Sequence, residues 1–254
     1  MQHSQRYFVQ LSYDGTAYHG WQSQPNAITV QTELESCFTR VLGREIALTG
    51  CGRTDTGVHA REYFAHFDFH QPQKISSLLT KANKMIPADI AIQHIFQVTD
   101  DAHARFSATN RTYRYYVNCE KSPFDEKYSL FYHGSLNVNE MNRAAGLLMK
   151  YSDFTSFAKL HSGAENNICE VREAFWKKNG TQLVFTITAN RFLRNMVRAI
   201  TGSLLDIGRG KINVDDFVGI IQARNRNLAG MSAKAKGLFL EKITYPDSIF
   251  LTGK

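Results

Sequence analysis

The sequence lacks the motifs that mark several common protein classes. It has no Cys-x-x-Cys pair, no Gly-x-x-x-x-Gly-Lys-Ser/Thr loop, no Gly-x-Gly-x-x-Gly loop and no Gly-x-Ser-x-Gly turn. Its four cysteines, at positions 37, 51, 119 and 169, are far apart. These absences argue against a zinc site, a nucleotide-cofactor loop and the common serine-hydrolase arrangement. We therefore expect neither a bound metal nor a cofactor.

Long apolar runs are also missing. No stretch is long enough to span a bilayer, and the polar residues from Met1 to Arg6 are not followed by an apolar segment. We expect a cytoplasmic protein with no signal peptide and no membrane contact. In that compartment the cysteines are expected to be reduced thiols.

The composition is that of a folded, basic protein. The chain has 254 residues, of which 43% are hydrophobic, enough for one large or two modest domains with a real core. The formal net charge is +7. A positive surplus of this size suits a polyanionic partner such as nucleic acid.

Hydrophobic periodicity predicts strands and helices in both halves of the chain. Apolar alternation indicates strands, whereas apolar residues three and four positions apart indicate helices. Asn179-Gly180 is typical of a hairpin turn. We expect an α+β fold of two halves, residues 1–120 and 121–254, joined near residues 121–131. The expected strands cover residues 8–13, 46–49, 63–69, 90–98, 112–119, 175–178 and 183–188, and the expected helices begin near residues 30, 77, 138, 190 and 214.

One predicted helix, residues 190–207, has a cationic side. At 100° per residue its apolar side chains gather on one face, and Arg191, Arg194 and Arg198 gather on the other. The cationic face is either an ordinary solvated surface or a surface aimed at phosphates or a carboxylate.

The segment from Gly52 to His59, GRTDTGVH, places Asp55 in a glycine-flanked turn beside Arg53. A nearby cation stabilises an ionised carboxylate, and glycines allow close backbone approach. A solvated surface loop is the plainer alternative. Asp55-Thr56-Gly57 also matches the aspartic-protease triplet. That chemistry needs a second carboxylate, no second triplet occurs, and the residues before Asp55 are polar and cationic, so we disfavour it.

An aromatic and basic strand follows at residues 111–116. Alternation puts Tyr113 and Tyr115 on one face, and Arg114 and Tyr116 on the other. Nucleobases stack on aromatic rings and guanidinium planes, while phosphates pair with cations. A core strand with charged edges fits the same pattern. The histidines are scattered without ligand spacing, and we expect structural or surface roles for them.

Together these motifs resemble the tRNA pseudouridine synthase A (TruA) family, whose catalytic motif is usually written GRTDAGVHA. Two departures stand out: Thr56 replaces the usual Ala, and Asn225 stands where an Asp often precedes Arg226. Further matching segments are residues 13–15, 20–22, 83, 87–91, 103–109, 111, 113–115, 153–157, 196–198, 202–204, 233–235 and 237–238.

The resemblance implies isomerisation of uridine to pseudouridine at positions 38, 39 and 40 of the tRNA anticodon stem-loop. It implies an α+β fold of two similar halves, with largely antiparallel sheets, around a central catalytic cleft, and it implies a homodimer. The isomerisation has no net redox change, so no cofactor is required. A non-catalytic tRNA-binding protein on the same scaffold is the alternative.

The resemblance also assigns roles to residues. Asp55 is the essential carboxylate, which attacks the uracil C6, attacks the ribose C1′ or removes the C2′ proton; the sequence leaves these three open. Arg198 is its partner, and Tyr113 stacks on the uracil of a flipped-out nucleotide and assists removal of the C5 proton. Arg53 fills the vacated space and binds phosphates. Further expected contacts to the RNA backbone are Lys84, Arg114, Arg191 and Arg194.

Overall fold

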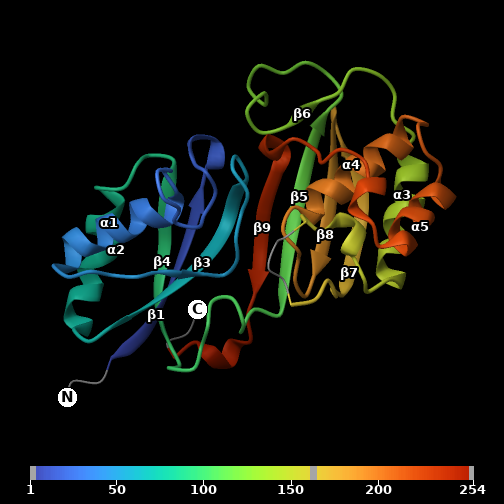
Figure 1. The fold of residues 1–254 in the computed structure, drawn as a ribbon. Coiled ribbons are helices and arrows are strands. Elements are labelled where there is room, and N and C mark those ends of the chain that lie inside the picture. The colour runs from blue at the N-terminus through green and yellow to red at the C-terminus, as the bar shows by residue number, and fades with distance from the viewer. Residues whose placement is uncertain (1–3, 161–164, 252–254) are drawn as a thin grey trace. The chain divides into compact units, whose positions relative to one another are not determined.

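The computed structural model describes residues 4–160 and 165–251 (Figure 1). Residues 1–3, which belong to the polar N-terminal stretch, lie outside this part. The chain forms two compact units. The first contains residues up to Thr109 and from Leu240 onward, and the second contains Asn110–Phe239. This division falls before the strand that carries Tyr113, earlier than the expected boundary after residue 120.

The first unit contains a sheet in which the central pairings are antiparallel. Its strands are β1 (Gln5–Tyr13), β2 (Thr49–Gly50), β3 (His59–Phe69), β4 (Ile90–Val98) and, from Leu240 onward, β9 (Leu238–Thr244). β1 lies between β3 and β4, so that Val9 is opposite Ala65 on one side and Ile95 on the other. β2 and β9 also lie beside β3. The expected strands at residues 8–13, 63–69 and 90–98 are confirmed.

The expected strand over residues 46–49 is wrong except at its end. Only Thr49 and Gly50 pair with β3. The preceding backbone is held by helix side chains instead: the Ile46 N–H donates to Thr39 Oγ1, and the Leu48 N–H donates to Glu35 Oε1. Because these N–H groups are satisfied by side chains, no neighbouring strand is needed there.

Two helices, α1 (Val30–Leu42) and α2 (Ile75–Asn83), cover one face of this sheet (Figure 1). α1 has Thr29 as its N-cap, in a reciprocal capping arrangement with Thr32, and Gly43 as its C-cap, whose φ of 75° is left-handed. Its apolar face carries Phe38, which packs edge-on against Phe67 of β3 with ring centroids 5.5 Å apart.

The opposite face of the first sheet is also buried. Phe8 and Phe64 pack against Tyr245, with ring centroids 5.2 and 5.1 Å apart. Tyr245 donates a hydrogen bond to the Ala104 carbonyl, 2.5 Å away. Burial on both faces explains why β3 is aromatic at consecutive positions rather than alternately apolar and polar.

The strands of the second unit pair mainly antiparallel. They are β5 (Asn110–Asn118), β6 (Leu130–Phe131), β7 (Val171–Asn179) and β8 (Gln182–Ala189). β8 pairs antiparallel with both β5 and β7, and β6 adds a short parallel pairing to β5. The expected hairpin is confirmed, because β7 and β8 meet at a turn in which Gly180 has a φ of 59°.

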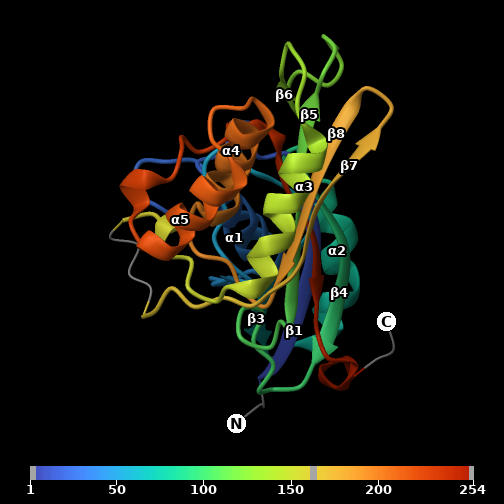
Figure 2. The ribbon, with the colours of Figure 1, turned by 90° about the vertical axis from the view of Figure 1, so that its right-hand side faces the viewer.

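Three helices, α3 (Val138–Leu147), α4 (Met196–Gly208) and α5 (Val214–Ala223), cover one face of this sheet (Figure 2). Side chains cap two of these helices: Asn137 accepts from the Glu140 N–H, and Asn213 forms a reciprocal pair with Asp216. α3 also shields the edge strand, since the Asn142 side chain hydrogen-bonds both the N–H and the carbonyl of Trp176 in β7.

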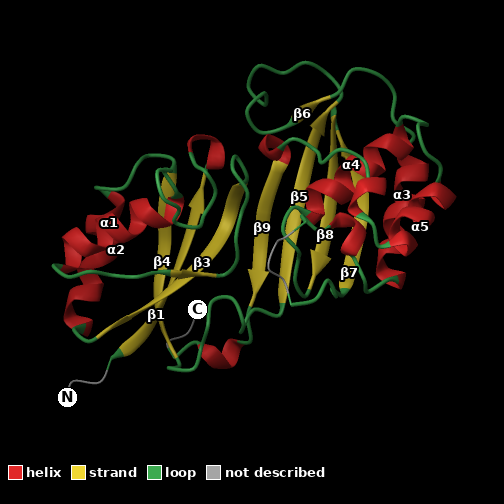
Figure 3. Cartoon of the chain, in the orientation of Figure 1, coloured by secondary structure: helices red, strands yellow, loops and turns green. Residues whose placement is uncertain are grey.

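The chain is therefore a mixed α/β protein with largely antiparallel strand pairing, which confirms the α+β expectation at this level (Figure 3). Within the described residues, no helix has the length and apolar character needed to cross a membrane. Short 3-10 turns complete the structure at Gly15–Ala17, Pro72–Lys74, Leu148–Lys150, Thr155–Phe157, Arg226–Leu228, Ala235–Gly237 and Asp247–Ile249.

We expect His66 to make the stability of the protein depend on pH. Burial, with repulsion from His103 and Arg6, lowers the pKa of His66 to about 4 from 6.5, and its Nδ1 accepts the Ala104 N–H at 3.1 Å. Between these pH values the unfolded chain binds the extra proton and the folded chain does not. The neutral form of His66 therefore contributes fully to the unfolding free energy above pH 6.5. This contribution, about 3 kcal/mol at most, is lost as the pH falls toward 4.

Urea unfolding at about pH 7.5 and about pH 4.5 measures this effect. His66→Gln should show a smaller decrease in unfolding free energy between these pH values than the wild type, whereas His94→Gln, at an exposed site on β4, should behave like the wild type. An equal pH dependence in the wild type and His66→Gln would contradict the assignment.

Candidate active site

Asp55 lies on the loop between β2 and β3 of the first unit. Its side chain is half-buried, the preceding Thr54 is buried, and Arg53 is exposed. The Val58 N–H donates to the Asp55 carbonyl at 3.1 Å, which closes a four-residue turn. The third residue of this turn, Gly57, has a φ of 75°, a conformation that favours glycine. The carboxylate is thus carried by a tight turn whose preceding residue, Thr54, is buried.

Hydrogen bonds from the body of the sheet hold both sides of this loop. The Cys51 N–H donates to the Phe64 carbonyl at 2.8 Å, and the Tyr63 hydroxyl donates to the Gly52 carbonyl. On the other side, the Thr54 hydroxyl is 2.9 Å from the Tyr13 hydroxyl. The backbone that carries Asp55 is therefore fixed by residues of β1 and β3.

The segment that follows β1 packs directly on the loop. The Gly57 N–H donates to the Tyr18 carbonyl at 3.3 Å, and the Gly15 N–H donates to Nδ1 of the buried His59 at 3.0 Å. Trp21 stacks on Tyr63 with ring centroids 4.1 Å apart. The aromatic stretch from Tyr18 to Gln22 thus supports the Asp55 turn.

Two glycines make this approach possible. A Cβ atom at Gly15 would lie 2.0 Å from the Val58 carbonyl oxygen, and one at Gly20 would lie 2.2 Å from the Thr54 carbonyl oxygen. Gly20 also has a φ of 86°. Any side chain at these positions would push the two segments apart.

In the second unit, Tyr113 lies on β5 opposite Ile187 of β8. It is half-buried, and its ring packs edge-on against Phe192 with centroids 5.1 Å apart. Arg114 is opposite Thr186 and therefore faces the other side of the sheet. The expected alternation is confirmed, and it separates Arg114 from Tyr113.

The expected helix over residues 190–207 is wrong in its first turn and a half. α4 begins at Met196, because Asn195 adopts a left-handed φ of 64°. The Arg194 carbonyl accepts the Lys159 N–H at 3.0 Å and is not used by a helix. Arg191 and Arg194 consequently lie on the segment before α4, and only Arg198 is on the helix.

Arg198 is clamped to a second segment of the same unit. Its backbone carbonyl accepts the Ala233 N–H at 2.9 Å, and its Nε donates to the Ala233 carbonyl at 2.8 Å. Beside this clamp the Asn195 amide donates to Ser232 Oγ at 2.7 Å. Ser232 and Phe192, which contact Asn195 and Tyr113, were not predicted from the sequence, although both are close in sequence to motif residues.

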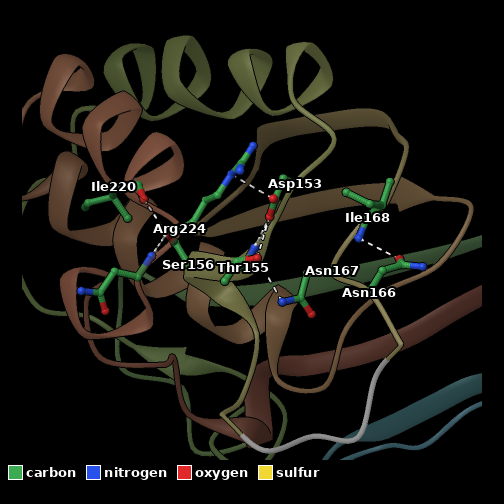
Figure 4. Close-up of polar contacts among 9 residues, drawn as sticks. Asp153, Thr155, Ser156, Asn166, Asn167, Ile168, Ile220 and Arg224 are labelled. Atoms are coloured by element: carbon green, nitrogen blue, oxygen red, sulfur yellow. Dashed lines mark hydrogen bonds and ion pairs between the residues drawn. The ribbon is translucent and has the colours of Figure 1, made fainter.

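Polar contacts hold the segment around Asp153 in the second unit (Figure 4). Asp153 accepts hydrogen bonds from the Thr155 N–H and hydroxyl and forms an ion pair with Arg224, Nε to Oδ2, at 3.0 Å. Asn166 accepts from Arg191 at 3.3 Å. This family-like segment has a structural role in the second unit.

Asn225 does not form the ion pair that an aspartate would offer at that position. Its Oδ1 accepts the Asn227 N–H at 3.0 Å. The guanidinium of Arg226 instead donates to the Ala229 carbonyl at 3.1 Å and to Ser232 Oγ at 3.0 Å. The neighbouring segment is therefore held without a carboxylate at residue 225.

The predicted site residues thus belong to two groups. Arg53 and Asp55 lie in the first unit, and Tyr113, Arg114, Arg191, Arg194 and Arg198 lie in the second. Within residues 4–160 and 165–251, no cluster of three or more His, Cys, Asp or Glu side chains could hold a metal ion.

Comparison with known proteins matches the chain over nearly its whole length. A family described as tRNA pseudouridine synthase matches residues 144–246. The tRNA pseudouridine synthase A of Bacteroides fragilis is 49% identical over 248 residues, covering 97% of this chain and 98% of that protein. Those of Porphyromonas gingivalis and Aliivibrio fischeri are 46% and 37% identical, covering 97% and 93% of this chain and 99% and 91% of those proteins.

Gly20→Ala should destabilise the protein through the Asp55 loop. The new Cβ meets the Thr54 carbonyl and the residue must keep a left-handed φ, so we expect a loss of about 2 kcal/mol or more in unfolding free energy. Urea unfolding measures this. Gly52→Ala is the matched control, because nothing lies within 4 Å of its added Cβ and its φ is ordinary. Equal stability of the two variants would refute the close approach as a constraint.

Proposed function

The chain belongs to the tRNA pseudouridine synthase A family and is an isomerase of uridine in tRNA, and we propose that it acts at positions 38, 39 and 40 of the anticodon stem-loop. The observation that carries this proposal is the single carboxylate, Asp55, on a turn held from both sides by the sheet and by the segment after β1. Such fixed placement is what a reacting group needs.

The reaction breaks the glycosidic bond between C1′ and N1, turns the uracil, and joins C1′ to C5. The proton lost from C5 balances the proton gained at N1, so atoms and oxidation state are conserved. Asp55 is the catalytic carboxylate in this proposal. It attacks the uracil C6, attacks C1′ or removes the C2′ proton, and the three routes share the need for an ionised, reachable oxygen.

Arg198 is proposed to be the cationic partner of Asp55. Its position supports this role: it lies in the first turn of α4, where the helix dipole disfavours a cation that has no anion nearby. The Ala233 carbonyl holds Nε and so orients the guanidinium. A guanidinium oriented in this way suits the charge-assisted hydrogen bonds that arginine forms with a carboxylate.

Tyr113 is proposed to stack on the target uracil and to assist removal of the C5 proton. Its ring is half-buried and is held by the edge-on contact with Phe192. An aromatic ring on a fixed strand is a surface on which a nucleobase can stack. A paired nucleotide must leave its stack to reach the site, at a cost of a few kcal/mol.

Arg53 is proposed to fill the space that the flipped nucleotide leaves and to bind phosphates. Its side chain is exposed on the same turn that carries Asp55. Arg191 and Arg194, on the segment before α4, and Arg114, on the other face of β5, are proposed contacts to the RNA backbone. We also propose that the protein is cytoplasmic and works as a homodimer.

Asp55→Asn should abolish pseudouridine formation without loss of tRNA binding. The amide keeps the size of the side chain but is neither a nucleophile nor a base, so we expect turnover to fall by roughly 10³-fold or more. Tritium release from C5-labelled tRNA measures turnover, and nucleotide-resolution mapping locates the product. Asp101→Asn, at an exposed site in the first unit, is the control and should leave both unchanged. Retained turnover in Asp55→Asn would overturn the assignment.

Arg53→Met should impair modification of paired uridines more than unpaired ones. Uridine 39 is paired in the stem and uridine 38 lies in the loop, so only the former needs the vacated space to be filled. We expect a roughly tenfold greater loss of kcat/KM for uridine 39. Arg143→Met, exposed on α3 and paired with Glu140, is the control. The same loss at both uridines would leave Arg53 a phosphate contact only.

A further inference from the structure

We propose that Lys234 binds a backbone phosphate of the tRNA next to the target nucleotide, an inference that rests on the proposed function. Lys234 lies on the segment that joins α5 to β9, in the second unit. No motif of the sequence analysis assigned it a role in binding.

The backbone at Lys234 is attached to both elements that carry predicted site residues in this unit. The Tyr115 hydroxyl, on β5 two residues after Tyr113, donates to the Lys234 carbonyl at 2.9 Å. The preceding carbonyl, of Ala233, accepts from Arg198 Nε on α4 at 2.8 Å. The backbone at Ala233 and Lys234 is therefore hydrogen-bonded to both β5 and α4.

Close packing prevents this segment from moving away. A Cβ at Gly202 of α4 would lie 1.9 Å from the Met231 carbonyl oxygen, and one at Gly237 would lie 2.8 Å from the Tyr115 ring. Both contacts are too short for any residue except glycine. The segment thus packs closely against α4 at Met231 and against β5 at Gly237. These contacts fix the backbone from which the Lys234 side chain extends.

The other cations of this segment are already engaged. Arg226 donates to the Ala229 carbonyl and to Ser232 Oγ. Lys236 donates to the Glu126 carbonyl at 2.7 Å and contacts the Glu126 carboxylate. The pKa of Glu126 is lowered first by that hydrogen bond and only to a smaller extent by Lys234.

Lys234, in contrast, is exposed, and in the described part of the chain its ammonium has no hydrogen bond or ion pair. A lysine side chain is a point charge on a flexible four-carbon stem, suited to a phosphate rather than to a base edge. From its fixed origin the stem can reach the phosphates that flank a nucleotide stacked on Tyr113. The exposed ammonium group and the closely packed backbone together assign a phosphate contact to Lys234.

The test compares Lys234→Gln and Lys236→Gln by tRNA binding over a series of KCl concentrations, with kcat and KM measured alongside. Lys234→Gln should reduce the slope of log Kd against log salt by about 1, the loss of one phosphate contact, and raise KM roughly tenfold with little change in kcat. Lys236→Gln should keep the wild-type slope, because Glu126 already neutralises that lysine. Lys234→Arg should restore both the slope and KM.

The outcomes separate this inference from the function on which it rests. If the wild type modifies tRNA but the slope for Lys234→Gln equals that of the wild type, the phosphate contact is wrong and the function stands. If the wild type forms no pseudouridine in tRNA, both are wrong. Thermal melting of Lys234→Gln should match the wild type, since its folded contacts are made by the backbone. A lowered melting temperature with an unchanged slope would mean a structural lysine.

Discussion

Close contact between two backbone segments is the constraint on which the Asp55 turn depends. Gly15 and Gly20 let the chain after β1 come within van der Waals range of the carbonyls of Val58 and Thr54. Hydrogen bonds at Gly57 and His59 then lock the two segments together. The carboxylate is displayed by a rigid frame, and little ordering remains to be done when a substrate arrives.

The second unit has the same kind of close backbone contact beside its predicted site residues. Glycines at 202 and 237 let the segment between α5 and β9 press against α4 and β5. In this segment the Ala233 carbonyl orients the Arg198 guanidinium, and the Lys234 backbone is held by the Tyr115 hydroxyl. Glycines 15, 20, 202 and 237 therefore allow close contacts that position the segments around the predicted site residues, while aromatic packing supplies the surrounding cores.

Most elements were predictable because their signals are local. The Thr29 and Asn213 caps, the Asn179-Gly180 hairpin and the alternation of β4 each depend on residues adjacent in sequence. The errors arose where distant groups took over backbone hydrogen bonds. Residues 46–48 are bound by side chains of α1, and the carbonyl before Asn195 is bound by Lys159, so a strand and a helical turn expected from periodicity do not form.

The sequence by itself supplied the groups that we propose to react, since one carboxylate in a glycine turn, a tyrosine strand and a surplus of basic residues can be recognised without coordinates. It also determined the α+β class, through periodicities that act over a few residues. Only the tertiary structure decided which arginines share a helix and that Lys234, unlike Lys236, forms no ion pair within the described residues. Arg191 and Arg194 precede the helix that carries Arg198, and Lys234 follows Ala233, whose carbonyl binds Arg198. The physical reason is that hydrogen-bond partners and charge pairing are set by residues far apart in the chain, which periodicity does not record.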